Sequence, residues 1–147
     1  LKDRRPDVPL AVLVAEPSDL DHLAAEIDPR TAALVAEHWP GPLTVVVRRS
    51  ADLSGWDLGG DPGTIGVRCP DHPLVRAVAV RTGPIATTSA NRSGEPTPPT
   101  AAEAAASLTG PVAVVADGGT LDGRASTVVD LTGPAPRSLR QGAVRIG

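Results

Sequence analysis

Aromatic side chains are almost missing from this sequence. Its 147 residues include no Phe, no Tyr and no Met, and the aromatic residues are Trp39 and Trp56. The core must therefore consist of Val, Leu, Ile and Ala, and stacking of nucleic-acid bases on aromatic rings is not expected. We predict that the two tryptophans anchor the core or a loop rather than serve as base-stacking platforms.

Cysteine and histidine are also scarce. The single cysteine, Cys69, excludes a disulfide within the chain and a cysteine-based zinc site. The three histidines, His22, His38 and His72, are too scattered to suggest a metal centre. We expect Cys69 to be a small buried filler and His72 to lie at a helix start. The cysteine usage favours a cytoplasmic protein.

Long apolar runs and an excess of positive charge are missing as well. No apolar run approaches the roughly 20 residues that a membrane helix needs, so no membrane partner is expected. The 14 basic and 17 acidic residues give a net charge of -3, so the chain as a whole is not a polyanion-binding surface. Any nucleotide site must be local. A content of 41% hydrophobic and 21% charged residues is typical of one globular domain.

The apolar runs and the breaks between them predict a mixture of strands and helices. Strands are predicted at 9–15, 43–47, 64–68, 85–88, 112–116, 127–131 and 137–139. Helices are predicted at 20–27, 29–38, 71–81 and 101–108. This mixture indicates an α/β or α+β domain around one twisted sheet, and the pattern leaves the strand order open.

Helix starts carry recognisable capping residues. Ser18 with Asp21 gives an approximate signal for the first helix, and Asp28 followed by Pro29 is typical of the second. Thr100 with Glu103 forms a capping box ahead of the alanine-rich helix.

Polar and basic groups follow the apolar strands, at the positions where open α/β sheets hold ligands. The segments concerned are 2–10, 64–73, 87–100 and 126–140. They contain, in chain order, Lys-x-Arg (2–4) before Pro-Leu (9–10), Trp-Pro-Gly-Pro-Leu-Thr (39–44), Gly-Thr-Ile-Gly-Val-Arg (63–68), Ser-Ala-Asn (89–91), Asp-Gly-Gly (117–119), Ser-Thr-Val-Val-Asp-Leu (126–131) and Leu-Arg-Gln-Gly-Ala (139–143). In this order and spacing, along essentially the whole chain, they closely resemble the YrdC-like family.

The resemblance implies a fold and an activity. The fold would be a single YrdC-like domain over 1–147, with a twisted mixed β-sheet, flanking helices and a basic concave ligand face. It would lack the family's first strand-helix segment. The implied activity joins L-threonine, bicarbonate and ATP into threonylcarbamoyl-AMP and pyrophosphate. A partner transferase would then pass the threonylcarbamoyl group to an adenosine in tRNA.

The implied chemistry needs no protein nucleophile. The threonine amine is carboxylated and the resulting carbamate attacks the α-phosphorus, so positioning and charge stabilisation carry the rate. Magnesium is expected with the ATP, but no carboxylate cluster reads as a dedicated site, so the ion would be held by the phosphates.

Candidate site residues follow from the matching motif positions. By resemblance, the ATP-binding residues are Lys2, Arg4, Thr64, Ser89, Asn91, Thr97 and Arg140, and the L-threonine-binding residues are Arg68, Thr87 and Ser126. A Lys ammonium suits a triphosphate as a point charge, and a guanidinium grips two carboxylate or phosphate oxygens at once.

Each of these assignments has a purely structural alternative. The basic opening is also typical of a solvated surface, and Arg68 and Arg140 could be exposed surface charges. The residues of 87–97 could be turn formers that satisfy their own backbone. Two departures from the family pattern also matter. Arg5 intervenes before Pro6, and Val8 and Leu13 occupy positions where some members place polar ligand contacts.

Two other functions are compatible with the sequence. A non-catalytic module for tRNA or double-stranded RNA would use the basic groups and predict salt-sensitive RNA binding without threonine, although the net charge weakens it. A domain of a larger carbamoyl-transferring protein would use carbamoyl phosphate. The sequence has none of that protein's accessory zinc-finger or acylphosphatase segments.

Overall fold

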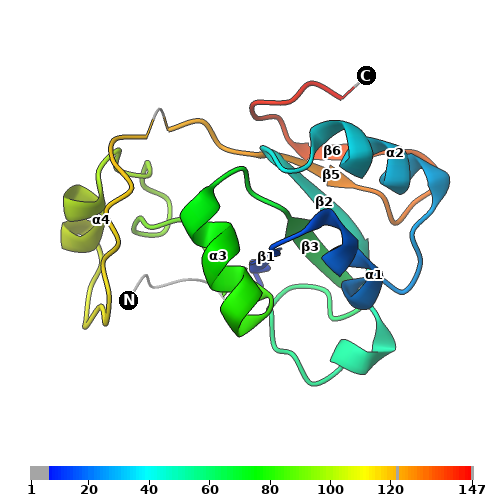
Figure 1. The fold of residues 1–147 in the computed structure, drawn as a ribbon, viewed down its shortest axis with the longest axis horizontal. Helices are drawn as coiled ribbons and strands as arrows, with labels where there is room; N and C mark the ends of the chain where they lie inside the picture. The colour runs from blue at the N-terminus through cyan, green and yellow to red at the C-terminus, as the bar shows by residue number, and fades with distance from the viewer. Residues whose placement is uncertain (1–6, 122, 147) are drawn as a thin grey trace.

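One mixed six-stranded sheet organises the molecule (Figure 1). The computed structural model describes residues 7–121 and 123–146. The strands are β1 (Ala11–Leu13), β2 (Leu43–Arg48), β3 (Thr64–Arg68), β4 (Ile85–Thr87), β5 (Thr127–Asp130) and β6 (Arg137–Arg140). Their order in the sheet is β4-β1-β3-β2-β5-β6, with β1–β3 and β2–β5 parallel and the other neighbours antiparallel. The predicted single domain built around a mixed sheet is confirmed.

Short helices flank this sheet. They are α1 (Leu20–Leu23), α2 (Pro29–His38), α3 (Pro73–Thr82) and α4 (Ala101–Ser107), with 3-10 turns η1 (Pro17–Asp19) and η2 (Ala51–Leu53). In Figure 1, α4 lies at one end of the molecule, beyond α3 and away from the sheet. None of the helices in the described ranges is long and apolar enough to cross a membrane.

The core lies on one face of the sheet. Successive residues of a strand point to opposite faces, and the cross-strand pairs Val12↔Val67 and Val45↔Val67 place these three side chains together. All three are fully buried and form one cluster with side chains from α1 and α2. The apolar strand cores inferred from the sequence therefore pack against the first two helices.

The predictions for the two tryptophans and Cys69 can be compared with this core. Trp39 is buried in it, and its indole Nε1 donates to the carbonyl of Leu43 at 2.8 Å. Trp56 is 37% exposed in the loop after η2, where its carbonyl accepts a hydrogen bond from Arg49 at 3.0 Å. Cys69 is fully buried, as predicted.

Helix starts at Asp28 and Thr100 are confirmed. The Asp28 carboxylate accepts from the backbone N–H of Thr31 at 2.7 Å, which satisfies one free donor of the first turn of α2. At α4, the backbone N–H of Glu103 donates to the Thr100 hydroxyl at 3.3 Å, and that hydroxyl donates to the Glu103 carboxylate at 2.7 Å. His72 is the cap residue of α3, which begins at Pro73 rather than at residue 71.

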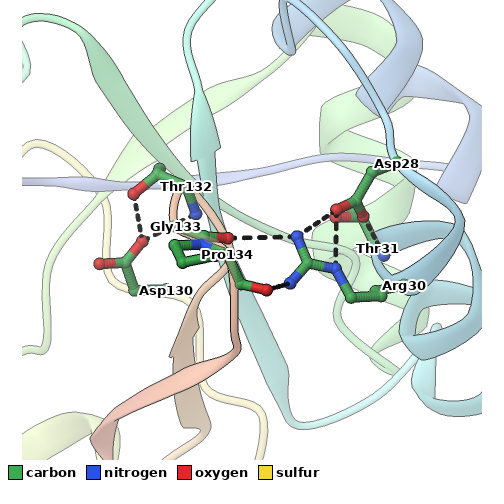
Figure 2. A network of polar contacts seen from close by, with 7 residues as sticks. All are labelled: Asp28, Arg30, Thr31, Asp130, Thr132, Gly133 and Pro134. Carbon is green, nitrogen blue, oxygen red and sulfur yellow. Dashed lines mark hydrogen bonds and ion pairs between the residues drawn. The ribbon is translucent and has the colours of Figure 1, made fainter.

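Arg30 ties the start of α2 to the turn between β5 and β6 (Figure 2). Its guanidinium donates to the Asp28 carboxylate, with an Nε–Oδ2 distance of 2.9 Å, and to the carbonyls of Gly133 and Pro134 at 3.2 and 2.6 Å. The hydrogen bond from Thr31, followed by that from Arg30, lowers the pKa of Asp28 to about 2. The ionised carboxylate therefore stabilises the fold.

Replacing Asp28 by asparagine is expected to make the free energy of unfolding depend less on pH in the acidic range. A depressed carboxyl pKa contributes stability that is present above about pH 4 and is lost as the pH falls toward 2. Asn keeps a capping oxygen but loses the charge, so we expect a loss on the order of 1 kcal/mol at pH 7 that shrinks between pH 5 and 2. Urea unfolding across this range measures the effect, with Asp21→Asn as an exposed control. A loss independent of pH would contradict the assignment.

Two predicted elements are corrected by the structure. The helix predicted at 20–27 ends at Leu23, because Ala24 leaves the helix to form a β-bridge with Arg49. Its capping signal is also wrong, since the Asp19 carboxylate, rather than Ser18 with Asp21, accepts the backbone N–H groups of residues 15 and 16. The strand predicted at 112–116 is irregular, and no described strand lies beside it to complete a hydrogen-bonded ladder.

Candidate active site

The face of the sheet opposite the core carries the predicted site residues Thr64, Arg68, Thr87 and Arg140. We call it the open face. Strand alternation and register assign to it Ala11, Leu13, Thr44, Val46, Arg48, Thr64, Gly66, Arg68, Ile85, Thr87, Val128, Asp130, Arg137 and Arg140. All of these except Thr44 keep part of their surface exposed, whereas the core-face valines of β1, β2, β3 and β5 are buried. A ligand can therefore reach this face.

Arg68 ends β3 on the open face. Its guanidinium Nε donates to the carbonyl of Gly41 at 2.9 Å, which directs the side chain toward the start of β2. Burial, and then the positive charge of nearby Arg140, lower the pKa of Arg68. No carboxylate among the described residues forms an ion pair with either arginine. Two guanidinium groups that repel each other, one of them partly desolvated, form a favourable place for an anion.

Ser126 joins Arg140 to the same place. The Arg140 guanidinium donates to the backbone carbonyl of Ser126 at 3.0 Å and to its hydroxyl at 2.9 Å. That hydroxyl also shares a 2.9 Å hydrogen bond with the hydroxyl of Thr44 on β2. Ser126 and Thr44 are both buried. The ends of β3 and β6 and the starts of β2 and β5 thus meet in one polar cluster.

The loop after β6 is seated closely against Ser126. A Cβ added at Gly142 would collide with the backbone of Ala125 and Ser126, so this position accepts no side chain without a backbone shift. Thr127 holds the same loop, since its hydroxyl accepts from the N–H groups of Gly142 and Val144, each at 3.0 Å, and donates to the Val144 carbonyl. These contacts fix the backbone beside Arg140.

Thr87 and Thr64 lie on the open face but outside the polar cluster. The Thr87 hydroxyl donates to the carbonyl of Ala11 at 3.1 Å. Thr87 lies two strands from β3, a lateral distance of about 10 Å, which leaves room for a small ligand between it and Arg68. Thr64 begins β3, at the opposite end from Arg68, and donates to the carbonyl of Asp61 at 3.3 Å.

The loop over 89–99 uses its polar side chains internally. The Asn91 side chain is buried, and its Nδ2 donates to the carbonyls of Arg92 and Glu95 at 2.8 and 2.6 Å. Its Oδ1 accepts from the Thr97 hydroxyl at 3.5 Å, and the Ser89 carbonyl accepts from the Asn91 backbone at 3.0 Å. These contacts hold the loop in shape, which agrees with the turn-former interpretation. Ser89 and Thr97 keep exposed surface.

The site includes residues that the sequence interpretation missed. Thr44 and the carbonyl of Gly41 both hold predicted site residues, and both belong to the Trp-Pro-Gly-Pro-Leu-Thr motif. In the sequence this motif served only for the family resemblance, although its threonine at the start of an apolar strand was a usable signal. Lys2 and Arg4 lie outside the described residues. Within the described ranges, no cluster of His, Cys, Asp and Glu forms a metal site.

Together, fold and site define an α/β domain whose open sheet face gathers guanidinium and hydroxyl groups at strand ends. The family model for Sua5, YciO and YrdC, described as "Telomere recombination", matches residues 1–142. The chain belongs to this Sua5/YciO/YrdC family.

Relatives and solved structures agree with this membership. A Mycobacterium tuberculosis protein is 40% identical, with 97% of this chain covered and 66% of the relative. Threonylcarbamoyl-AMP synthase of Bacillus subtilis is 37% identical, with 97% of this chain and 42% of the relative covered. The crystal structure of Pyrococcus abyssi Sua5 complexed with L-threonine has a TM-score of 0.83 at 35% identity, covering 96% of this chain and 42% of that one. The chain thus spans 42–66% of the length of these relatives.

Proposed function

We propose that this protein is a threonylcarbamoyl-AMP synthase, which forms threonylcarbamoyl-AMP and pyrophosphate from L-threonine, bicarbonate and ATP. The observation that carries the proposal is the meeting of Arg68 and Arg140 beside Ser126 on the open face, with no described carboxylate paired to either arginine. Such a cluster suits a ligand with carboxylate and phosphate groups. The likeness to a Sua5 structure complexed with L-threonine supports it.

The proposed threonine subsite lies between Arg68 and Thr87. The Arg68 guanidinium would hold the carboxylate of threonine, a role for which a planar two-pronged donor is well suited. Ser126 would contact the same substrate from the start of β5. Burial around Arg68 strengthens this contact, because the guanidinium has already lost part of its hydration in the free protein.

The proposed ATP subsite extends from Arg140 across the open face. Arg140 would stabilise phosphate charge, and Thr64 would contact the nucleotide. Ser89, Asn91 and Thr97 would contribute from the 89–99 loop, and Lys2 and Arg4 from the basic opening. Side chains of this site bind and orient the substrates, so that the threonine carbamate attacks the α-phosphorus without a covalent protein intermediate. Magnesium would enter bound to the ATP phosphates, and its charge would offset theirs.

The proposed product must be the substrate of a second enzyme. Threonylcarbamoyl-AMP is an activated acyl adenylate, so a transferase that passes its threonylcarbamoyl group to an adenosine in tRNA belongs to the proposal, as does a cytoplasmic location. The predicted basic concave face and direct RNA binding remain predictions. Arg68 and Arg140 are the described basic groups at the proposed site.

Pyrophosphate release tests the proposed activity. The purified protein is incubated with ATP, magnesium and bicarbonate, with and without L-threonine. We expect release that saturates with threonine and stops when bicarbonate is removed. Release that ignores threonine would exclude the synthase. RNA binding that falls steeply with salt and needs no threonine would favour the non-catalytic RNA module instead.

A further inference from the structure

Leu13 lies directly beside Arg68 on the open face. It pairs with Arg68 across the parallel β1–β3 ladder and with Ile85 across the antiparallel β1–β4 ladder. Side chains at paired positions share a face, with Cβ atoms about 4.5–5.5 Å apart. Leu13 and Ile85 are both partly exposed, and neither belongs to the core cluster. An aliphatic patch therefore borders the proposed carboxylate-binding arginine.

Two small residues, Ala11 and Gly66, adjoin this patch. Ala11 pairs with Gly66 on one side and with Thr87 on the other. A Cβ added at Gly66 would only touch methyl groups of Thr44 and Val46, at 3.7 and 3.8 Å, so open space lies above the glycine. The side chains on the open face between Arg68 and Thr87 are thus small, and Leu13 and Ile85 border them with aliphatic groups.

The hydroxyl groups on the open face around Ala11 and Gly66 already have protein partners. Thr87 donates to the Ala11 carbonyl, Thr64 donates to the Asp61 carbonyl, and Ser126 and Thr44 share one hydrogen bond. Ser126 also accepts from Arg140. A substrate hydroxyl beside Leu13 meets the Thr87 hydroxyl, whose hydrogen is donated to the Ala11 carbonyl, while an aliphatic side chain meets Leu13 and Ile85.

We propose that Leu13, with Ile85, makes the amino-acid subsite select an aliphatic β-branched side chain, so that L-valine is a second substrate. The inference rests on the proposed function. The reaction balances as it does for threonine: valine, bicarbonate and ATP give the N-carboxylated valine joined to AMP, with release of pyrophosphate and water. An apolar subsite separates isosteres that differ by one hydroxyl by only about 100-fold, whereas a site built around that hydroxyl reaches about 10,000-fold or more.

Competition among amino acids tests the proposal. Specificity constants for pyrophosphate release are measured with L-threonine, L-valine and L-serine, and binding of each is measured by calorimetry. We expect the constants for threonine and valine to lie within about 100-fold of each other, and that for serine, which lacks the methyl group, to fall about tenfold or more below threonine. Rejection of valine by 10,000-fold or more, with threonine active, would overturn the proposal and leave the synthase standing.

A substitution at Leu13 tests the residue itself. Leu13→Asn places a polar amide of similar size at the patch, so the threonine-to-valine ratio should rise about tenfold through loss of valine activity. Leu74→Asn, at a more exposed leucine on α3 outside the proposed site, is the control and should leave the ratio unchanged. An unchanged ratio in folded Leu13→Asn would refute the role of Leu13. If no amino acid binds or supports release, the proposed function and this inference both fail.

Discussion

Replacing Arg68 by alanine is expected to lower the specificity constant for L-threonine by about 100-fold or more. The substitution removes a charge-assisted pair of hydrogen bonds from a partly desolvated site, a loss of about 3 kcal/mol. Arg68→Lys should recover little, because an ammonium has a single charged point in place of the planar fork. Steady-state pyrophosphate release at varied threonine measures both variants.

The matched control for Arg68 is Arg81→Ala. Arg81 is an exposed arginine in the last turn of α3 and has no role in the proposed site. Its removal should leave the threonine dependence within about twofold, since isolated surface charges contribute little. If Arg68→Ala keeps wild-type threonine dependence, Arg68 does not hold the substrate carboxylate.

Replacing Gly142 by alanine is expected to damage both stability and nucleotide binding. The added methyl group would collide with the backbone of Ala125 and Ser126, and backbone atoms cannot move aside as a flexible side chain can. Forced repacking of this kind costs about 1–3 kcal/mol. The shift would also move Ser126, which Arg140 holds by two hydrogen bonds. Urea unfolding and ATP titration measure the two effects.

Gly55→Ala is the control for this substitution. An added Cβ at Gly55 meets no atom within 4 Å, so its stability should change by no more than about 0.5 kcal/mol. Equal behaviour of the two alanine variants would show that the loop after β6 does not press on Ser126 in solution.

Local sequence signals predicted much of the fold because they act over a few residues. Asp28 and Thr100 bind N–H groups three residues ahead, so their caps are visible in the sequence. The 112–116 segment failed for the opposite reason. Its valines have the composition of a strand, but a strand also needs a neighbour to pair with, and that requirement is not local.

The site was predictable in part. Family motifs pointed to Arg68, Ser126 and Arg140, and the structure brings these three together. Thr44, whose hydroxyl bonds that of Ser126, lies 82 residues from Ser126 in the chain, and only the pairing of β2 with β5 makes the two neighbours. Asn91 shows the reverse situation, since its motif suggested a nucleotide contact and its amide nitrogen is spent on the loop backbone.

The departure at Leu13 shows what the sheet adds to a motif. In the sequence it is one apolar residue within an apolar run. The strand register places it between Arg68 and Ile85 on the open face, rather than in the core with Val12. Its side chain therefore belongs to the proposed substrate surface, and its chemistry bears on which amino acid is chosen.

The most direct test of the synthase proposal is to identify the product. The purified protein is supplied with ATP, magnesium, L-threonine and ¹³C-labelled bicarbonate, and the nucleotide fraction is analysed by mass spectrometry. We expect an adduct of threonine and AMP that carries the labelled carbon, formed together with pyrophosphate and absent when threonine is omitted. Pyrophosphate release without a labelled adduct, or a folded protein that forms neither, would contradict the synthase proposal.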